Sequence, residues 1–436
     1  MTVARLHNDA MAWLAPDAHE LPSSPLTWLN RLRSDALERA NELTVPTTRD
    51  EEWRFTDLSP LIRLSFQPSH AAPALAASDV APFEAPEAVV RLVFVDGIFS
   101  PALSSNGVLP DSVAVTNLAA ALKTHGEIIE PHLGHLAGFQ DNVFTALNTA
   151  FMHDGAAVII GRGQRVSAPV HLLFISARPE TASYPRTLVI AEEGAEAVII
   201  EDHVSIGNGV DFSNAVTEIA VAANARVKHV KLQRDNVQAF HIANCSAALE
   251  RDAVLSSCAV TLGGRLSRYN LNVAQQGEGA QCEIDGLTLI SGRQLADSHT
   301  MIDHAAPHGR SRQINKCIVG GGAHAVFNGK IVVRPGAQLV NSAQESRNLL
   351  LSGRARIDTK PQLEIFADDV KCAHGATVGQ LEPEQVFYLV SRGLSESMAR
   401  NLLTYAFGAE IINRIPVPSL VERLQKAVLE HTQVAS

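Results

Sequence analysis

A repeated pattern of short apolar runs separated by turns constrains the fold of this chain more than any other feature. Between Ala156 and Lys371, runs of Val, Ile and Leu alternate with Gly, Asn, Asp and Ser, and helical periodicity is absent. A small turn residue followed by Ala precedes many of these runs. The first three spacings are 30, 28 and 27 residues and the last two are 14 and 18, for the set Ala195, Ala225, Ala253, Ala280, Ala323, Ala337 and Ala355. A period of about 28 residues, with half-periods of about 14, predicts a flattened parallel solenoid with two strands in each turn.

The composition supports this prediction. Only 5% of the residues are aromatic although 46% are hydrophobic, so the core must be built from Ala, Val, Leu and Ile. Long parallel stacking would bury such side chains in a continuous aliphatic core. A β-sandwich also contains many short strands, and it is the structural alternative.

The charge and the apolar pattern exclude several classes of protein. A net charge of −10 argues against a nucleic-acid partner held by its phosphates. The chain has no run of about 18 apolar residues, so the sequence predicts no membrane span. The first residues lack a basic segment followed by an apolar one, so no signal peptide is expected.

The five cysteines are widely scattered and odd in number, and no C-x-x-C occurs. This pattern fits a reducing cytoplasm and argues against a disulfide framework. It also argues against a stable iron–sulfur cluster held by four cysteines of this one chain, because such sites show clustered spacing. The cysteines are Cys245, Cys258, Cys282, Cys317 and Cys372.

Three domains follow from the change in pattern along the chain: a helical and mixed region at 1–150, the β-solenoid core at 151–378 and a helical domain at 379–436. In the first region, Asp96-Gly97 predicts a hairpin turn between two strands. In the last, Ser395 is expected to cap a helix, and Ser419-Leu-Val-Glu422 reads as a capping box for the final helix. These helices would either cap the open end of the solenoid or dock a partner.

Cys372 and His374 are the strongest candidate site. They lie two residues apart just after a β-rich run, and in a strand residues i and i+2 point to the same face. A thiolate and an imidazole are good ligands for iron or zinc. Two ligands do not complete a tetrahedral site, so a metal here would borrow ligands from elsewhere, for example from another chain. The alternative is a small buried Cys and a satisfied His at the end of a strand.

A second cluster lies between Asp297 and His308 and contains His299, His304 and His308 together with Asp303. These side chains could bind a metal, or they could form polar ladders at solenoid turns, which is the commoner use of such residues. The chain has no Walker A loop, no G-x-G-x-x-G, no G-x-S-x-G and no H-E-x-x-H, so the sequence predicts no nucleotide site of its own.

Five segments, in order along nearly the whole chain, resemble the SufB/SufD family of the SUF iron–sulfur cluster assembly scaffold. They are Arg49-x-Glu-Glu-Trp-Arg-Phe-Thr, Asn148-Thr-Ala-Phe, Asp303-His-Ala-Ala-Pro-His308, Phe327-Asn-Gly-Lys330 and Asp369-Val-Lys-Cys-Ala-His-Gly375. Within the family the chain is similar to the SufD branch, for two reasons. SufB-like chains carry a cysteine near the segment Glu345-Ser-Arg-Asn348, where this chain has none. They also tend to carry Glu after the histidine that aligns with His374, where this chain has Gly375.

The resemblance implies a mainly β fold, namely a right-handed parallel β-helix flanked by helical regions. It implies a non-catalytic scaffold subunit that acts with a SufB-like subunit and the SufC ATPase, the ATPase being docked through the C-terminal helices. No cofactor would be stably bound, but iron or a nascent iron–sulfur cluster would be held transiently. His374 would be an iron ligand and Cys372 a supporting thiolate or sulfur acceptor, at the interface with the partner subunit.

An exposed solenoid edge would also allow the isolated chain to form a homodimer. Two other functions remain open from the sequence. One is a β-helix enzyme acting on polysaccharide, which would need an exposed cleft with paired carboxylates or basic residues. The other is a purely structural interaction protein.

Overall fold

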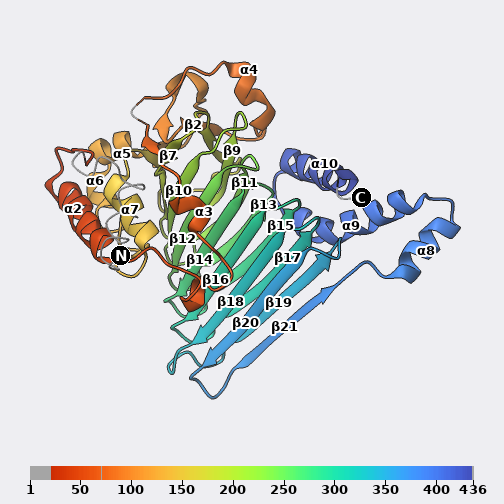
Figure 1. The fold of residues 1–436 in the computed structure, drawn as a ribbon. Coiled ribbons are helices and arrows are strands. Elements are labelled where there is room, and N and C mark those ends of the chain that lie inside the picture. The colour runs from red at the N-terminus through yellow and green to blue at the C-terminus, as the bar shows by residue number, and fades with distance from the viewer. Residues whose placement is uncertain (1–20, 70, 435–436) are drawn as a thin grey trace.

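The computed structural model describes residues 21–69 and 71–434, which form two long β-sheets flanked by helices (Figure 1). The segment in which no signal peptide is expected lies outside the described residues. The first sheet has 11 strands, of which β1 (Gln67–Pro68) and β7 (Thr181–Ser183) pair at its side. Its main path runs through β20 (Arg356–Ile365), β18 (His324–Val333), β16 (Leu295–His304), β14 (Leu266–Gln275), β12 (Phe240–Leu249), β10 (Phe212–Val221), β8 (Arg186–Ala191), β5 (Gly155–Ile160) and β4 (Val113–Asn117).

The second sheet has 10 strands. In order they are β21 (Lys371–Gly379), β19 (Asn341–Leu350), β17 (Arg310–Val319), β15 (Gln281–Ile290), β13 (Val254–Thr261), β11 (Arg226–Arg234), β9 (Glu196–Ser205), β6 (Val170–Ser176), β2 (Val90–Val95) and β3 (Ile98–Phe99). From β8 onward the chain alternates between the sheets, and each strand pairs in parallel with the strand one turn earlier. The predicted parallel β-helix is therefore confirmed, and the sandwich alternative is wrong.

The first four alanines of the repeat mark turns that enter strands of the second sheet, whereas Ala323 and Ala355 precede β18 and β20 of the first sheet. Ala195, Ala225, Ala253 and Ala280 are completely buried one residue before β9, β11, β13 and β15. The residue before each alanine has a positive φ, which favours Gly, Asn and Asp: Gly194 (70°), Asn224 (61°), Asp252 (56°) and Gly279 (72°). The repeat in the sequence thus has two causes: the turn needs a residue with a positive φ, and the buried position after it has no space for a side chain larger than that of alanine.

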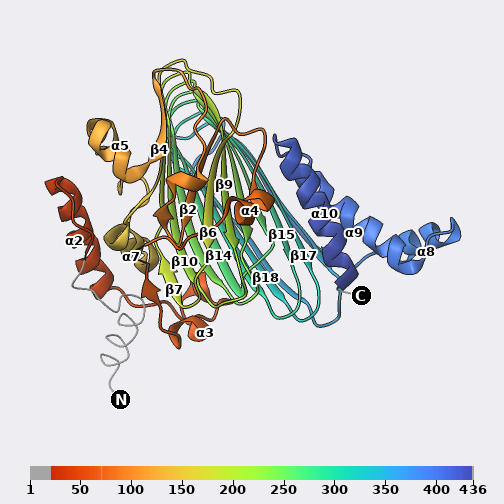
Figure 2. The same cartoon turned by 90° about the horizontal axis from the view of Figure 1, so that it is seen from above.

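N-terminal helices cover the outer face of the first sheet at one end of the solenoid (Figures 1 and 2). The helices α2 (Thr27–Glu42) and α7 (Val143–Phe151) share an apolar cluster with Phe212 and Phe240 of the sheet. The helices α5 (Leu118–Thr124) and α6 (Gly126–Ile129) pack beside β5 and β8. The remaining short elements are η1 (Glu51–Trp53), α3 (Ser59–Ile62), α4 (Ala77–Val80), η2 (Ala81–Phe83) and η3 (Pro101–Leu103).

The hairpin prediction is confirmed: β2 and β3 are antiparallel, and Asp96 and Gly97 between them have φ values of 49° and 80°. Among the described residues, no helix is both long enough and apolar enough to cross a bilayer.

The C-terminal helices are α8 (Pro383–Ser391), α9 (Glu396–Ile412) and α10 (Pro418–Val434). Ile411, Ile412 and Leu424 pack against the outer face of the second sheet, so these helices cover a side of the solenoid, and the predicted role as a cap on its open end is wrong (Figures 1 and 2). The Ser395 cap is confirmed, since its hydroxyl accepts from the Met398 N–H at 3.2 Å. The capping box is wrong: Ser419 lies inside α10, and its N–H and hydroxyl donate to Glu87.

Candidate functional site at the open end of the solenoid

The C-terminal end of the solenoid is open. In the part of the chain that the structure describes, β20 pairs only with β18 and β21 only with β19, so each has one unpaired edge (Figure 1). The unpaired N–H and C=O groups of such an edge are a template for another strand. At the other end the sheets stop at the short strands β4 and β3, which pair antiparallel with one neighbour each, whereas β20 and β21 are long parallel strands.

Cys372 and His374 both lie on β21, at the open end. They pair in register with Ser342 and Gln344 of β19, whose side chains are buried between the two sheets. Residues that are paired in register on neighbouring strands point to the same face of the sheet. Cys372 and His374 therefore both point to the inward face of the solenoid. The prediction that they share one face is confirmed.

The two side chains differ in exposure. Cys372 is half-buried and packs against the interior apolar cluster, whereas His374 is exposed because no turn lies beyond it. Burial raises the pKa of the Cys372 thiol, an effect that a backbone hydrogen bond from Ser342 partly opposes. A nearby cation or a bound metal ion would be needed to favour the thiolate.

The histidines of the second cluster do not come together. His299 faces outward and contacts Glu52 (Nδ1 to Oε2, 3.1 Å) and Asp297 (Nε2 to Oδ1, 3.0 Å). His304 faces inward and contacts the Ser311 hydroxyl at 2.9 Å, and His308 occupies a turn with φ 61°. No group of three or more metal-ligating side chains is found among the residues described. The polar-ladder alternative is the one that this geometry supports.

The segment that carries the Arg49-x-Glu-Glu-Trp-Arg-Phe-Thr motif lies across the outer face of the first sheet. Trp53 is buried, its ring centroid lies 5.6 Å from that of Phe144 in a tilted arrangement, and the Arg268 guanidinium carbon lies 4.3 Å from the Trp53 ring centroid. Arg268 also donates to the Glu52 carbonyl and forms a buried ion pair with Asp297. The motif therefore anchors the N-terminal region to β14 and β16.

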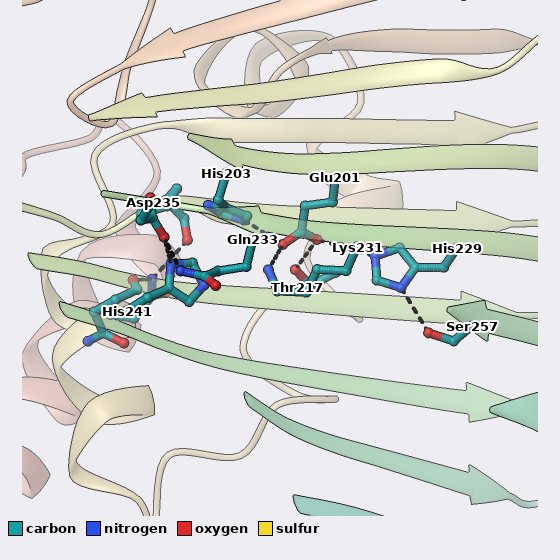
Figure 3. A network of polar contacts seen from close by, with 12 residues as sticks. Glu201, His203, Thr217, His229, Lys231, Gln233, Asp235, His241 and Ser257 are labelled. Atoms are coloured by element: carbon teal, nitrogen blue, oxygen red, sulfur yellow. Dashed lines mark hydrogen bonds and ion pairs between the residues drawn. The ribbon is translucent and has the colours of Figure 1, made fainter. Parts of the chain in front are cut away.

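The interior of the solenoid holds a charged network that the sequence analysis missed (Figure 3). Glu201 is 1% exposed and is surrounded by four donors: Lys231 (2.5 Å), Thr217 (2.7 Å), His203 (2.8 Å) and His229 (3.4 Å). Burial alone would raise the pKa of Glu201, but Lys231 and the two histidines hold it well below its usual range. The predicted continuous aliphatic core is confirmed, because one apolar cluster runs inside the solenoid from Val90 to Ala367, and in the middle turns the charged network shares the interior with it.

A second part of this network centres on Asp235. His241 lies 3.1 Å from its carboxylate and Gln233 donates to it at 2.7 Å. Burial opposes ionisation, but the bond to His241 lowers the pKa of Asp235 to about 2, while burial and the nearby Asp235 charge raise the pKa of Asp211 to about 8. The signal in the sequence was the alternation Glu201-x-His203 and His229-x-Lys231-x-Gln233, which places polar side chains on one face of each strand.

Comparison with known proteins identifies the family. Residues 174–407 match the family described as "SUF system FeS cluster assembly, SufBD core domain", and residues 15–172 match the "SufBD protein N-terminal region". The chain belongs to the SufBD family. Its role is thus in iron–sulfur cluster assembly by the SUF system, and the resemblance recognised in the five sequence motifs is confirmed.

Several relatives of this SufBD chain are similar over most of their length. An iron–sulfur cluster assembly SufBD family protein of Synechocystis is 43% identical over 91% of this chain and 89% of its own. The iron–sulfur cluster assembly protein SufD of Escherichia coli is 35% identical over 84% of each chain. Protein ABCI7, chloroplastic, of Arabidopsis thaliana is 32% identical over 91% of this chain and 84% of its own.

Proposed function

We propose that this chain is a non-catalytic scaffold subunit that builds a nascent iron–sulfur cluster in the cytoplasm together with a SufB-like subunit and the SufC ATPase. His374 binds iron through a neutral imidazole, and Cys372 acts as a supporting thiolate or sulfur acceptor. Iron and sulfide are cargo of the complex, and no cofactor is stably bound by this chain alone. All five cysteines are free in the described part of the chain, which fits a reducing compartment.

The observation that carries this proposal is the position of the pair. Cys372 and His374 point inward from the last strand, at the end where both sheets stop with unpaired edges. A partner that adds strands to β20 and β21 would cover the inward face and bring its own ligands to the same point. The exposed Ile365 and Phe366, which end β20 and follow it, add apolar area to that edge. A second copy of this chain can use the same edge, which gives the homodimer.

The C-terminal helices supply a separate docking surface for the ATPase. Phe387 is 73% exposed on α8, and Met398 is 59% exposed on α9, with Tyr388 and Leu402 also exposed. Exposed apolar groups of this size on neighbouring helices are typical of a protein interface. Since α10 and the second half of α9 are held on the sheet, α8 and the start of α9 remain available (Figure 2).

One reconstitution tests these points. The chain is co-expressed with a SufB-like subunit and the ATPase, the complex is isolated, and iron and labile sulfide are measured beside its thermal melt. We expect His374→Ala to remove most of the bound iron and sulfide, while the free energy of unfolding changes by well under about 1 kcal/mol because the side chain is exposed. His308→Ala, an exposed histidine in a turn, is the matched control and should load normally.

Two further variants separate the parts of the proposal. Cys372→Ser should reduce loading mildly if the partner supplies the essential thiolate, and severely if Cys372 itself accepts the sulfur. Replacing Phe387 and Met398 by Ser should release the ATPase and leave the pair of scaffold subunits intact. Normal loading in His374→Ala contradicts the iron-ligand role, and lost loading with a lowered melting temperature assigns His374 a structural role instead.

A further inference from the structure

A column of polar side chains runs inside the last turns of the solenoid and ends at His374. On the second sheet, Gln313, Gln344 and His374 occupy the same register position in β17, β19 and β21. Gln313 and Gln344 are each only 2% exposed. Two consecutive buried glutamines below an exposed histidine are not required by the solenoid, because the same position in β15 is Ile284.

Three hydrogen bonds link the polar groups of this column. Gln313 Nε2 donates to the Thr300 hydroxyl at 2.8 Å, and Gln313 Oε1 accepts from that hydroxyl at 3.2 Å and from Gln344 Nε2 at 2.8 Å. With Gln313 Oε1 facing Gln344, the Gln344 amide presents its Nε2, because the opposite orientation would place two carbonyl oxygens against each other. Gln344 Oε1 is then left without a hydrogen-bond partner among the described residues, although it is buried. A buried acceptor without a partner costs about 1–3 kcal/mol, so such an atom calls for an explanation.

The opposite sheet is built to admit the Gln344 amide. Gly329 of β18 follows Thr300 of β16 in register and faces the same interior. A Cβ on Gly329 would lie 2.3 Å from Gln344 Nε2 and 2.7 Å from the Phe327 ring. Pro361 follows Gly329 in β20 and carries no polar side chain, so that strand gives His374 no partner at this position.

We infer that Gln344 is a positioning residue for His374: its free Oε1 accepts the N–H of one ring nitrogen and leaves the lone pair of the other directed out of the open end. Neighbouring strands bring such register pairs within side-chain reach, and the exposed imidazole needs only a change of rotamer to make the bond. A histidine that ligates a metal usually donates its second ring N–H to a carbonyl or carboxylate, which fixes the tautomer. The inference rests on the proposed iron-ligand role of His374, and it gives the Phe327-Asn-Gly-Lys330 motif a function, namely space for the Gln344 amide.

The test measures the His374 tautomer in the full chain. Protein labelled with ¹⁵N-histidine is examined by long-range ¹H–¹⁵N correlation, and the His374 signals are assigned by their loss in His374→Ala. In the unsubstituted chain we expect one dominant tautomer, and in Gln344→Met a mixture of both. Gln344→Glu keeps an acceptor at the same place and should restore a single tautomer.

Gln275→Met is the matched control. Gln275 is a buried glutamine of β14 that donates to the Cys282 sulfur and the Arg310 carbonyl and lies outside this column, so the variant should lose thermal stability without any change in the His374 signals. In the reconstituted complex, Gln344→Met should weaken iron binding by about tenfold or more, the usual effect of removing the partner of a metal-bound histidine.

The outcomes separate this inference from the proposed function. Identical His374 signals in Gln344→Met and in the unsubstituted chain overturn the positioning role, whatever the complex does. A tautomer that depends on Gln344, combined with normal loading in His374→Ala, upholds the contact and refutes the iron-ligand role.

Discussion

The ion pair between Lys231 and Glu201 is the interaction whose loss we expect to damage the solenoid most. Its atoms are 2.5 Å apart, and the two residues are 2% and 1% exposed. Replacing Lys231 by Met keeps a side chain of similar length but removes the positive charge. Glu201 then keeps the bonds from Thr217 and the two histidines and has no cation beside it.

The size of the effect follows from that burial. Removing one partner of a buried ion pair typically costs about 3–5 kcal/mol, because the remaining charge is uncompensated. For a cooperative unit of 150–250 residues, roughly the size of the solenoid core, each kcal/mol lowers the melting temperature by about 2–4 °C. We therefore expect Lys231→Met to lower it by roughly 6–20 °C near neutral pH.

The pH dependence gives an independent check. In the unsubstituted protein Glu201 has a lowered pKa, so its ionisation adds stability above the unfolded pKa of about 4.3 and that stability is lost as the pH falls through the folded value. In Lys231→Met, burial raises the pKa of Glu201 above the unfolded value, so the variant loses stability as the pH rises. The difference in melting temperature should thus be larger at about pH 8 than at about pH 5.

The assay is a series of thermal melts with two controls. Lys228→Met changes an exposed lysine of the same strand and should have almost no effect. The double variant Lys231→Met, Glu201→Gln removes both charges and should regain at least half of the loss, since replacing a whole buried pair is often close to neutral. A loss of less than about 2 °C in Lys231→Met, or an equal loss in the double variant, would refute the reasoning.

Two further substitutions test the interior. Gly329→Ala should cost about 1–3 kcal/mol, because its methyl group overlaps the Gln344 amide, whereas Gly336→Ala, with nothing within 4 Å of the new atom, should be nearly neutral in denaturant titrations. Asp211 has a raised pKa of about 8 in the folded protein, so the unfolded chain ionises first and stability falls as the pH rises from the unfolded pKa toward 8. Asp211→Asn removes this pH dependence, so its melting temperature should rise relative to that of the unsubstituted protein between about pH 5 and about pH 8. A difference in melting temperature that stays constant over this range would contradict the raised pKa of Asp211.

The solenoid was predictable from the sequence because its turns leave a local record. The residue before each of the four alanines that precede β9, β11, β13 and β15 has a positive φ, and this requirement selects Gly, Asn or Asp at regular spacing. The hairpin at Asp96-Gly97 and the Ser395 cap were predictable for the same reason: each depends on a few neighbouring residues. The shared face of Cys372 and His374 followed from the two-residue period of a strand.

The tertiary structure decided what no local pattern records. Whether Glu201, Lys231 and the two histidines meet depends on the register of β9 against β11 and on which face of each strand is enclosed. The sequence shows polar residues in alternation, which is equally typical of a strand with one solvated face. Only the closure of two sheets around these side chains makes the charges compensate each other.

The same limit applies to the open end and to the helices that were expected to cover it. The sequence by itself determined the repeat, the turns and the helical character of the C-terminal region. Packing placed Ile411, Ile412 and Leu424 against the side of the second sheet, because apolar side chains there complete an apolar cluster that the open end does not offer. Because these helices pack on the side of the second sheet, through contacts between residues far apart in the chain, β21 stays uncovered and His374 is accessible at the last turn.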